Sequence, residues 1–170
     1  MDTTRLQDKI VLVTGAAQGM GAAVAEHYAA QGAKVCVGDV NVDGVNEVAQ
    51  RINDAGGTAI AVNLDVTKRV DIIAAVAATV EAFGSINVVL NNAGINKPLM
   101  FLDITEDKDL VAIGKFEKEG ESMDQLAEGI LLKRYSQPED ILGTASFLAS
   151  SESDYMTGQL LMIDGGMVVQ

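Results

Sequence analysis

Cysteine, tryptophan, proline and histidine are scarce in this chain of 170 residues, which has one cysteine, no tryptophan, two prolines and one histidine. The single thiol, Cys36, cannot form an internal disulfide, which fits a reducing compartment. The first residues also lack the basic-then-apolar pattern of a signal peptide, so we expect a cytoplasmic location. Neither His27 nor Cys36 stands in a cluster with metal-ligand spacing, and no metal site is predicted.

Positive charge is scarce as well, with 12 lysines and arginines against 24 aspartates and glutamates and a net charge of −12. Such an acidic protein repels phosphate backbones and anionic lipid, which argues against nucleic-acid and membrane partners. No apolar stretch approaches the length of a membrane span. The hydrophobic fraction of 48% is too high for a disordered chain, and the length suits a single domain over residues 1–170.

Short apolar runs alternate with segments of helical periodicity through the first half of the chain. Hydrophobic residues are continuous within the runs, as in a parallel sheet that helices cover on both faces. This alternation predicts right-handed βαβ units and an α/β fold, a doubly wound parallel sheet of Rossmann type. The expected strands are 10–13, 35–37, 58–62 and 86–90, and the expected helices follow the first three of them.

The third helical segment is expected to begin at Thr67 and to end at Gly84. Apolar side chains at helical spacing predict the face that packs on the sheet. They are Ile72, Val76, Thr79 or Val80, and Phe83.

This pattern breaks in the second half of the chain. Thr105–Glu121 is dense in charge and contains no strand-like run, and Glu117–Glu119 within it is most simply an exposed face or a mobile lid. A capping-box spacing with an early proline at Ser136–Glu139 predicts a helix that ends near Ser150. A last apolar run, Leu160–Ile163, predicts a final strand.

A glycine cluster, Thr14–Gly21, lies between the first strand and the first helix. Glycine is needed where backbone approaches a pyrophosphate closely, and a helix N-terminus supplies N–H donors and positive dipole. The spacing is G-x-x-x-G-x-G rather than the commoner G-x-G-x-x-G. Ordinary turn chemistry is the alternative interpretation of such a cluster.

Asp39 follows the second strand, 18 residues beyond Gly21, where a dinucleotide fold places its ribose acceptor. A carboxylate there accepts both ribose hydroxyls of NAD and repels a 2′-phosphate. At ~4 Å and an effective dielectric of about 20, two like charges repel by about 4 kcal/mol. No lysine or arginine occurs in residues 38–46 to compensate, so NAD is favoured. The alternative role for Asp39 is to cap the next helix.

Two more motifs follow in order, Leu64–Val66 after the third strand and Asn91–Gly94 after the fourth. Together with T-G-x-x-x-G-x-G and the strand-end aspartate, they give the chain a pattern that resembles the short-chain dehydrogenase/reductase family. Segments 133–140 and 155–166 are similar to that family's last helix and last strand.

The resemblance covers residues 6–105 and about 121–166, with a join near 105–111. It implies oxidation of a secondary alcohol or polyol with NAD, or reduction of the matching ketone, with the C-terminal part most like the polyol and diol dehydrogenases. It also implies a small-molecule substrate and a homo-oligomer, usually a tetramer joined through the last helices and strands. Glutamine at position 18, where members that use NADP tend to have arginine, again favours NAD.

The cofactor residues that the resemblance implies fall into three groups. Those along the pyrophosphate and adenosine ribose are Gly15, Gln18, Gly19, Met20 and Gly21, joined by Asp39; those at the adenine edge are Asp65 and Val66; and those along the nicotinamide ribose are Asn92, Ala93 and Gly94.

One departure from the family is as informative as the match. The family's catalysis uses a serine, a tyrosine and a lysine four residues after the tyrosine, together with an asparagine. In this chain no tyrosine is followed by a lysine at that spacing; the residues found there are Gly32, Glu139 and Gln159. We therefore predict no catalytic residues in this chain, and a fold shortened by about two βα units, on the order of 60 to 80 residues.

Three interpretations remain open at this point. The protein could be an active dehydrogenase whose complete chain carries a further segment, a truncated chain that binds NAD without catalysis, or a truncated chain that folds poorly and does neither. A contiguous chain that folds is expected to move the strand Leu160–Ile163 against the fourth strand. This predicts a five-stranded sheet of order 3-2-1-4-5.

Overall fold

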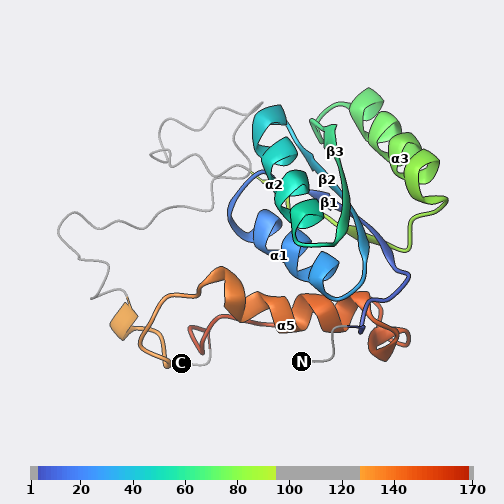
Figure 1. Ribbon diagram of the computed structural model, residues 1–170. Coiled ribbons are helices and arrows are strands. Elements are labelled where there is room, and N and C mark those ends of the chain that lie inside the picture. Colours follow the sequence, from blue (N-terminus) through green and yellow to red (C-terminus); the bar gives the residue numbers. More distant parts are fainter. Residues whose placement is uncertain (1–3, 95–126, 169–170) are drawn as a thin grey trace. The chain divides into compact units, whose positions relative to one another are not determined.

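The computed structural model describes residues 4–94 and 127–168 (Figure 1). Residues 4–93 and 137–162 belong to one compact unit, whereas 94, 127–136 and 163–168 belong to a second. The charged segment Thr105–Glu121 and the expected join near 105–111 lie outside the described residues.

A parallel sheet organises the first unit. Its strands are β1 (Ile10–Thr14), β2 (Lys34–Asp39), β3 (Thr58–Asn63) and β4 (Val88–Leu90), in the order β3-β2-β1-β4. Leu12 at the centre of β1 lies opposite Cys36 on one side and Val89 on the other. The two strands that follow β1 along the chain extend the sheet on one side of it, and β4 lies on the other side, so the chain changes direction at β1.

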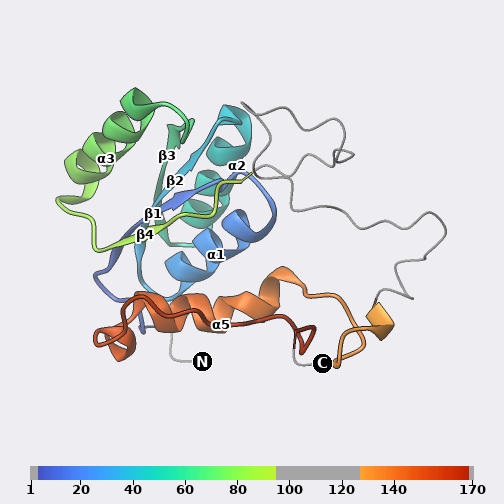
Figure 2. The ribbon, with the colours of Figure 1, turned by 180° about the vertical axis from the view of Figure 1, so that it is seen from behind.

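Helices cover both faces of the sheet. Helices α1 (Gly19–Ala30) and α2 (Val42–Asp54) lie on one face and α3 (Arg69–Phe83) on the other, as Figures 1 and 2 show from opposite sides. A further helix, α5 (Pro138–Ala149), lies beside α1. The predicted doubly wound α/β fold of Rossmann type is thereby confirmed. Within the described ranges, no helix is long and apolar enough to cross a membrane.

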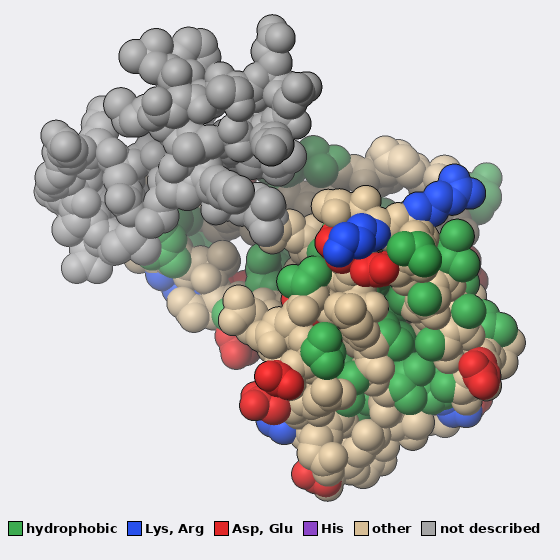
Figure 3. All heavy atoms as spheres, turned by 90° about the horizontal axis from the view of Figure 1, so that it is seen from above, with side chains coloured by type: hydrophobic (Ala, Val, Ile, Leu, Met, Phe, Trp, Pro, Cys, Tyr) green, Lys and Arg blue, Asp and Glu red, His purple; other side chains and the backbone are tan. Residues whose placement is uncertain are grey.

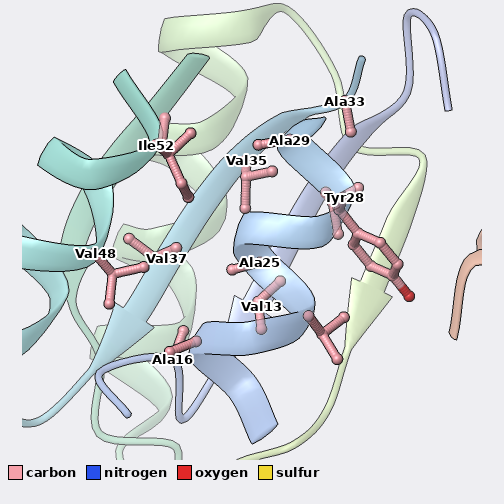
Figure 4. Packing of buried hydrophobic residues seen from close by; sticks show 14 of the residues in the cluster. Val13, Ala16, Ala25, Tyr28, Ala29, Ala33, Val35, Val37, Val48 and Ile52 are labelled. Carbon is pink, nitrogen blue, oxygen red and sulfur yellow. The ribbon is translucent and has the colours of Figure 1, made fainter. Parts of the chain in front are cut away.

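Small and β-branched side chains fill the core between the sheet and the helices α1 and α2 (Figure 4). Val35 and Val37 of β2 are fully buried there, and Ala25 of α1 lets helix and sheet approach closely. Tyr28 is the largest buried side chain, with 2% of its surface exposed. Its hydroxyl donates a hydrogen bond to the Ala145 carbonyl at 2.9 Å and so ties α1 to α5.

The face that α3 turns to the sheet differs from the expected one. The helix begins at Arg69 rather than Thr67, and its buried residues are Ala75 and Thr79. Of the expected inner residues Thr79 is correct, whereas Ile72, Val76 and Val80 are 41%, 39% and 42% exposed. Small residues allow a helix to lie close to a sheet, and the Thr79 hydroxyl is satisfied by the Ala75 carbonyl at 2.7 Å. Hydrophobic side chains consequently appear on the molecular surface, as Figure 3 shows for one face.

The predicted fifth strand is wrong. In the part of the chain that the structure describes, the sheet ends at β4, and Leu160–Ile163 has no regular secondary structure. Leu160 is 83% exposed. The strand at that side of the sheet, β4, is three residues long and so offers only a short edge for a further strand.

Candidate cofactor-binding site

The predicted site residues gather at one edge of the sheet. The glycine loop follows β1, Asp39 ends β2, Asp65 follows β3 and Asn92 follows β4. Carboxyl ends of parallel strands share one edge, and that edge, beside the strand at which the chain changes direction, is where ligands bind in open α/β sheets. All the predicted site residues except Gly94 belong to the first unit; Gly94 is exposed and belongs to the second.

Close packing explains the glycines of the loop. Gly15 has a φ of +66°, and a Cβ on it would stand 2.7 Å from the Ala93 Cα. A Cβ on Gly21 would stand 2.2 Å from the Gly15 carbonyl oxygen. The loop therefore lies directly on the chain that leaves β4, and no larger residue fits at either position.

The N-terminus of α1 emerges from this loop. Gln18 is its cap residue, but its side chain makes no capping hydrogen bond, and the first turn, which includes Gly19, carries no acidic residue. The dipole and the first N–H groups of the helix are therefore directed at the edge of the sheet without a competing carboxylate from that turn. Met20, in the first turn, is 52% exposed. Such an arrangement suits a pyrophosphate.

Two backbone donors orient the Asp39 carboxylate. The N–H of Ala17 in the glycine loop donates to Oδ2 at 3.2 Å, and the N–H of Asn41 donates to Oδ1 at 3.0 Å. Each oxygen keeps a further lone pair for an outside donor. Asp39 does not cap α2, because the Asn41 side chain accepts from the Gly44 N–H at 3.1 Å and fills that role. The helix-capping alternative for Asp39 is thereby excluded.

The side-chain amide group of Asn92 is hydrogen-bonded to the glycine loop. Its side-chain Nδ2 donates to the carbonyls of Thr14 and Gly15, at 3.0 Å each. The backbone N–H groups of Asn92 and Ala93 donate to the Thr14 hydroxyl at 3.1 and 3.0 Å. Thr14 thus joins β1 to the chain after β4. Thr14 belongs to the predicted glycine motif, but its spacing alone predicts no role for its hydroxyl.

The Asp65 carboxylate is also held by its own chain. Its Oδ1 accepts from the backbone N–H and the hydroxyl of Thr67, at 3.0 and 2.7 Å, and its Oδ2 lies 3.1 Å from the Lys68 ammonium. These hydrogen bonds, those from Thr67 first, lower the pKa of Asp65 to about 2. Asp71 accepts from the Asp65 N–H at 3.2 Å, so the pair shapes the turn before α3. Val66 is 41% exposed beside it.

Two of the described tyrosines, Tyr28 and Tyr155, give no sign of a proton-transfer group. Burial raises the pKa of Tyr28 to about 12, and its hydroxyl is engaged with Ala145. Tyr155 is fully exposed. Among the residues that the structure describes, no cluster of three or more histidine, cysteine or acidic side chains could hold a metal ion.

Comparison with known families agrees with this geometry. The model of the family described as short chain dehydrogenase matches residues 9–113, more than half of the chain. A second model, described as enoyl-(acyl carrier protein) reductase, matches residues 109–168. The chain belongs to the short-chain dehydrogenase/reductase family.

Among curated proteins, the chain is 46% identical over 94 residues to the 2,5-dichloro-2,5-cyclohexadiene-1,4-diol dehydrogenase LinX of Sphingobium indicum, a match that covers 55% of this chain and 38% of that one. It is 44% identical over 113 residues to the L-rhamnose 1-dehydrogenase (NAD(P)(+)) of Azotobacter vinelandii, which covers 64% of this chain and 44% of that one. The chain therefore matches less than half the length of these relatives.

Solved structures show the same fold. A short-chain type dehydrogenase/reductase from Mycobacterium marinum superposes with a TM-score of 0.84 at 23% identity, over 99% of this chain and 98% of that one. A hydroxysteroid dehydrogenase from Escherichia coli gives a TM-score of 0.78 at 24% identity, over 97% of this chain and 99% of that one.

Proposed function

We propose that this chain binds NAD(H) at the edge of the sheet, as the cofactor half of an oxidoreductase that transfers hydride between NAD(H) and a secondary alcohol, polyol or ketone. The observation that carries the proposal is the Asp39 carboxylate, which Ala17 and Asn41 hold at the end of β2. Asp39 would accept the ribose hydroxyls on its two oxygens, and the N-terminus of α1 would hold the pyrophosphate. The glycines of the loop leave room for that approach.

The choice of NAD over NADP rests on charge. A 2′-phosphate would stand against the Asp39 carboxylate, and Gln18 offers no positive charge to offset the repulsion. Calorimetric titration at fixed ionic strength should give a lower Kd for NADH than for NADPH. Equal or tighter binding of NADPH would refute this part of the proposal.

Catalysis is where the chain departs from its family. Without a tyrosine and lysine at the required spacing, the proton of the alcohol has no acceptor while hydride moves. We therefore expect the chain by itself to bind NAD(H) without turnover. The alternative to the oxidoreductase is a truncated NAD-binding domain without catalytic activity.

Two measurements separate these alternatives. An intact mass near 17.8 kDa identifies the chain as the whole protein, whereas a mass many kilodaltons larger supports the complete enzyme. With protein of verified mass, no NADH should form with a panel of polyols and secondary alcohols. Steady NADH production by the 17.8 kDa species would contradict the proposed lack of activity.

The remaining parts of the proposal are a small-molecule substrate, no nucleic-acid or membrane partner, a cytoplasmic location and assembly into a homo-oligomer, a tetramer by family resemblance. Support for assembly comes from exposed apolar side chains in α5 and after it. Leu148 is 49% exposed and Met162 is 57% exposed. Light scattering on the purified chain tests the oligomer directly.

A further inference from the structure

The first turn of α2 lies unusually close to the glycine loop. A Cβ placed on Gly44, in that turn, would stand 2.8 Å from the Ala17 Cβ and 2.8 Å from the Asn41 Nδ2. Both distances are shorter than the 3.4 Å at which ordinary van der Waals contact begins. The backbone of Gly44 has no positive φ, so the need for glycine here is one of space and not of conformation.

Neither neighbour can move out of the way at low cost. The Ala17 Cβ is a single methyl that moves only with its own backbone. The Asn41 side chain accepts from the Gly44 N–H at 3.1 Å, so turning it away would uncap α2. A methyl at position 44 must therefore displace the glycine loop, the start of α2, or both.

These same two residues orient Asp39. The Ala17 N–H holds Oδ2 at 3.2 Å, which is already at the long end of the hydrogen-bond range, and the Asn41 N–H holds Oδ1 at 3.0 Å. A displacement of either neighbour lengthens one of the two bonds and frees the carboxylate to rotate. The orientation of the Asp39 carboxylate therefore depends on the packing around Gly44.

We infer that Gly44 is a positioning residue for nucleotide selection: the absence of its side chain lets Ala17 and Asn41 hold Asp39 in the orientation that accepts the ribose hydroxyls and rejects a 2′-phosphate. This inference rests on the proposed binding of NAD(H).

A purely structural role for Gly44 makes a different prediction. Alanine is a better helix former than glycine, so without the contact to Ala17 the variant Gly44→Ala would be at least as stable as the parent and would keep its selectivity. A general loosening of the fold would weaken NADH and NADPH equally. Only the linkage to Asp39 changes the ratio of the two affinities.

The experiment compares four proteins by calorimetric titration with NADH and NADPH at fixed ionic strength. They are the parent chain, Gly44→Ala, the double variant Ala17→Gly/Gly44→Ala, and Gly143→Ala as the matched control. Gly143 also lies in a helix, α5, and a Cβ there would meet nothing within 4 Å.

Gly44→Ala should weaken NADH by about tenfold while NADPH changes less, so that the selectivity ratio falls. Removing the Ala17 methyl in the double variant should restore part of the ratio, because the contact with the Asn41 Nδ2 at 2.8 Å remains, and Gly143→Ala should leave the ratio unchanged. A ratio within about twofold of the parent in folded Gly44→Ala would overturn the inference.

A readout without ligand separates this inference from the proposed function. The backbone amide proton of Ala17 should exchange with solvent faster in Gly44→Ala than in the parent, because its bond to Asp39 is longer. Failure of the parent to bind NADH would refute the proposed function, whereas unchanged exchange at Ala17 would refute the linkage. If Gly44→Ala does not fold, the double variant compared with Ala17→Gly alone tests the second contact, because only the double variant places a methyl against the Asn41 side chain. A lower selectivity ratio in the double variant would then support the inference, and an equal ratio would count against it.

Discussion

The Asn92 side chain donates to the Gly15 carbonyl at 3.0 Å, across 77 positions of sequence, and to the Thr14 carbonyl at the same distance. This contact joins the chain after β4 to the loop after β1. It holds β1, the edge strand β4 and the glycine loop together, because a planar amide with two donors fixes both its partners. The precision of the loop thus depends on a residue from another part of the sheet.

Asn92→Ala should destabilise the fold by about 1–3 kcal/mol, because it leaves two carbonyls without their donor. The free energy of unfolding in urea measures the loss. Asn91→Ala is the control, because Asn91 is exposed. If Asn92→Ala and Asn91→Ala lowered the free energy of unfolding by equally small amounts, the Asn92 side chain would not be what holds the glycine loop in place.

Asp39→Asn should bring the affinities for NADH and NADPH closer by about tenfold, because it removes the charge that repels a 2′-phosphate. The matched control is Asp43→Asn, which removes an acidic charge from the first turn of α2. A selectivity change of the same size in both variants would mean that net charge, and not the position of Asp39, sets the preference. Titration of both nucleotides at one salt concentration is the measurement.

The pKa of Asp65, lowered from 3.8 to about 2 by Thr67 and Lys68, predicts a pH-dependent share of the stability. A carboxyl whose folded pKa is depressed stabilises the fold above its unfolded pKa, and that contribution is lost as pH falls through the folded pKa. The parent should therefore exceed Asp65→Asn in unfolding free energy near neutral pH. The difference should shrink as pH falls from about 4 toward about 2. Urea unfolding across this range checks the prediction, and a gap independent of pH would contradict it.

Tyr28→Phe should cost about 1 kcal/mol, because it removes the hydrogen bond from the Tyr28 hydroxyl to the Ala145 carbonyl of α5 while keeping the ring in the core. Thermal unfolding and hydrogen exchange in α5 report the change. Tyr155→Phe, at a fully exposed position, should alter neither. Unchanged exchange in α5 of Tyr28→Phe would show that this bond does not hold the helix.

Much of the fold followed from patterns that are local in the chain. Continuous apolar runs such as Ile10–Val13 predicted strands buried on both faces, and glycine at position 32, with a φ of +92°, follows the end of α1. The position of Asp39 at the end of β2 could likewise be predicted, because the residues that indicate a strand, a turn and a helix lie within a few positions of each other. These features depend on backbone preferences and on side-chain polarity, both of which follow from the residue types alone.

Other features depend on which distant groups meet. Apolar residues lie on several sides of α3, so periodicity could not show that Ala75 and Thr79 are the buried residues while Ile72 and Val76 remain 41% and 39% exposed. Whether Leu160–Ile163 pairs as a strand depends on the length of the edge that β4 offers, which is set by the three residues Val88–Leu90. The contacts of Asn92 with Thr14, and of Gly44 with Ala17, are decided only when the strands and loops are assembled. The residue types at this site are in the sequence, but their partners are a property of the tertiary structure, because hydrogen bonds and steric contacts act over a few ångströms of space whatever the separation along the chain.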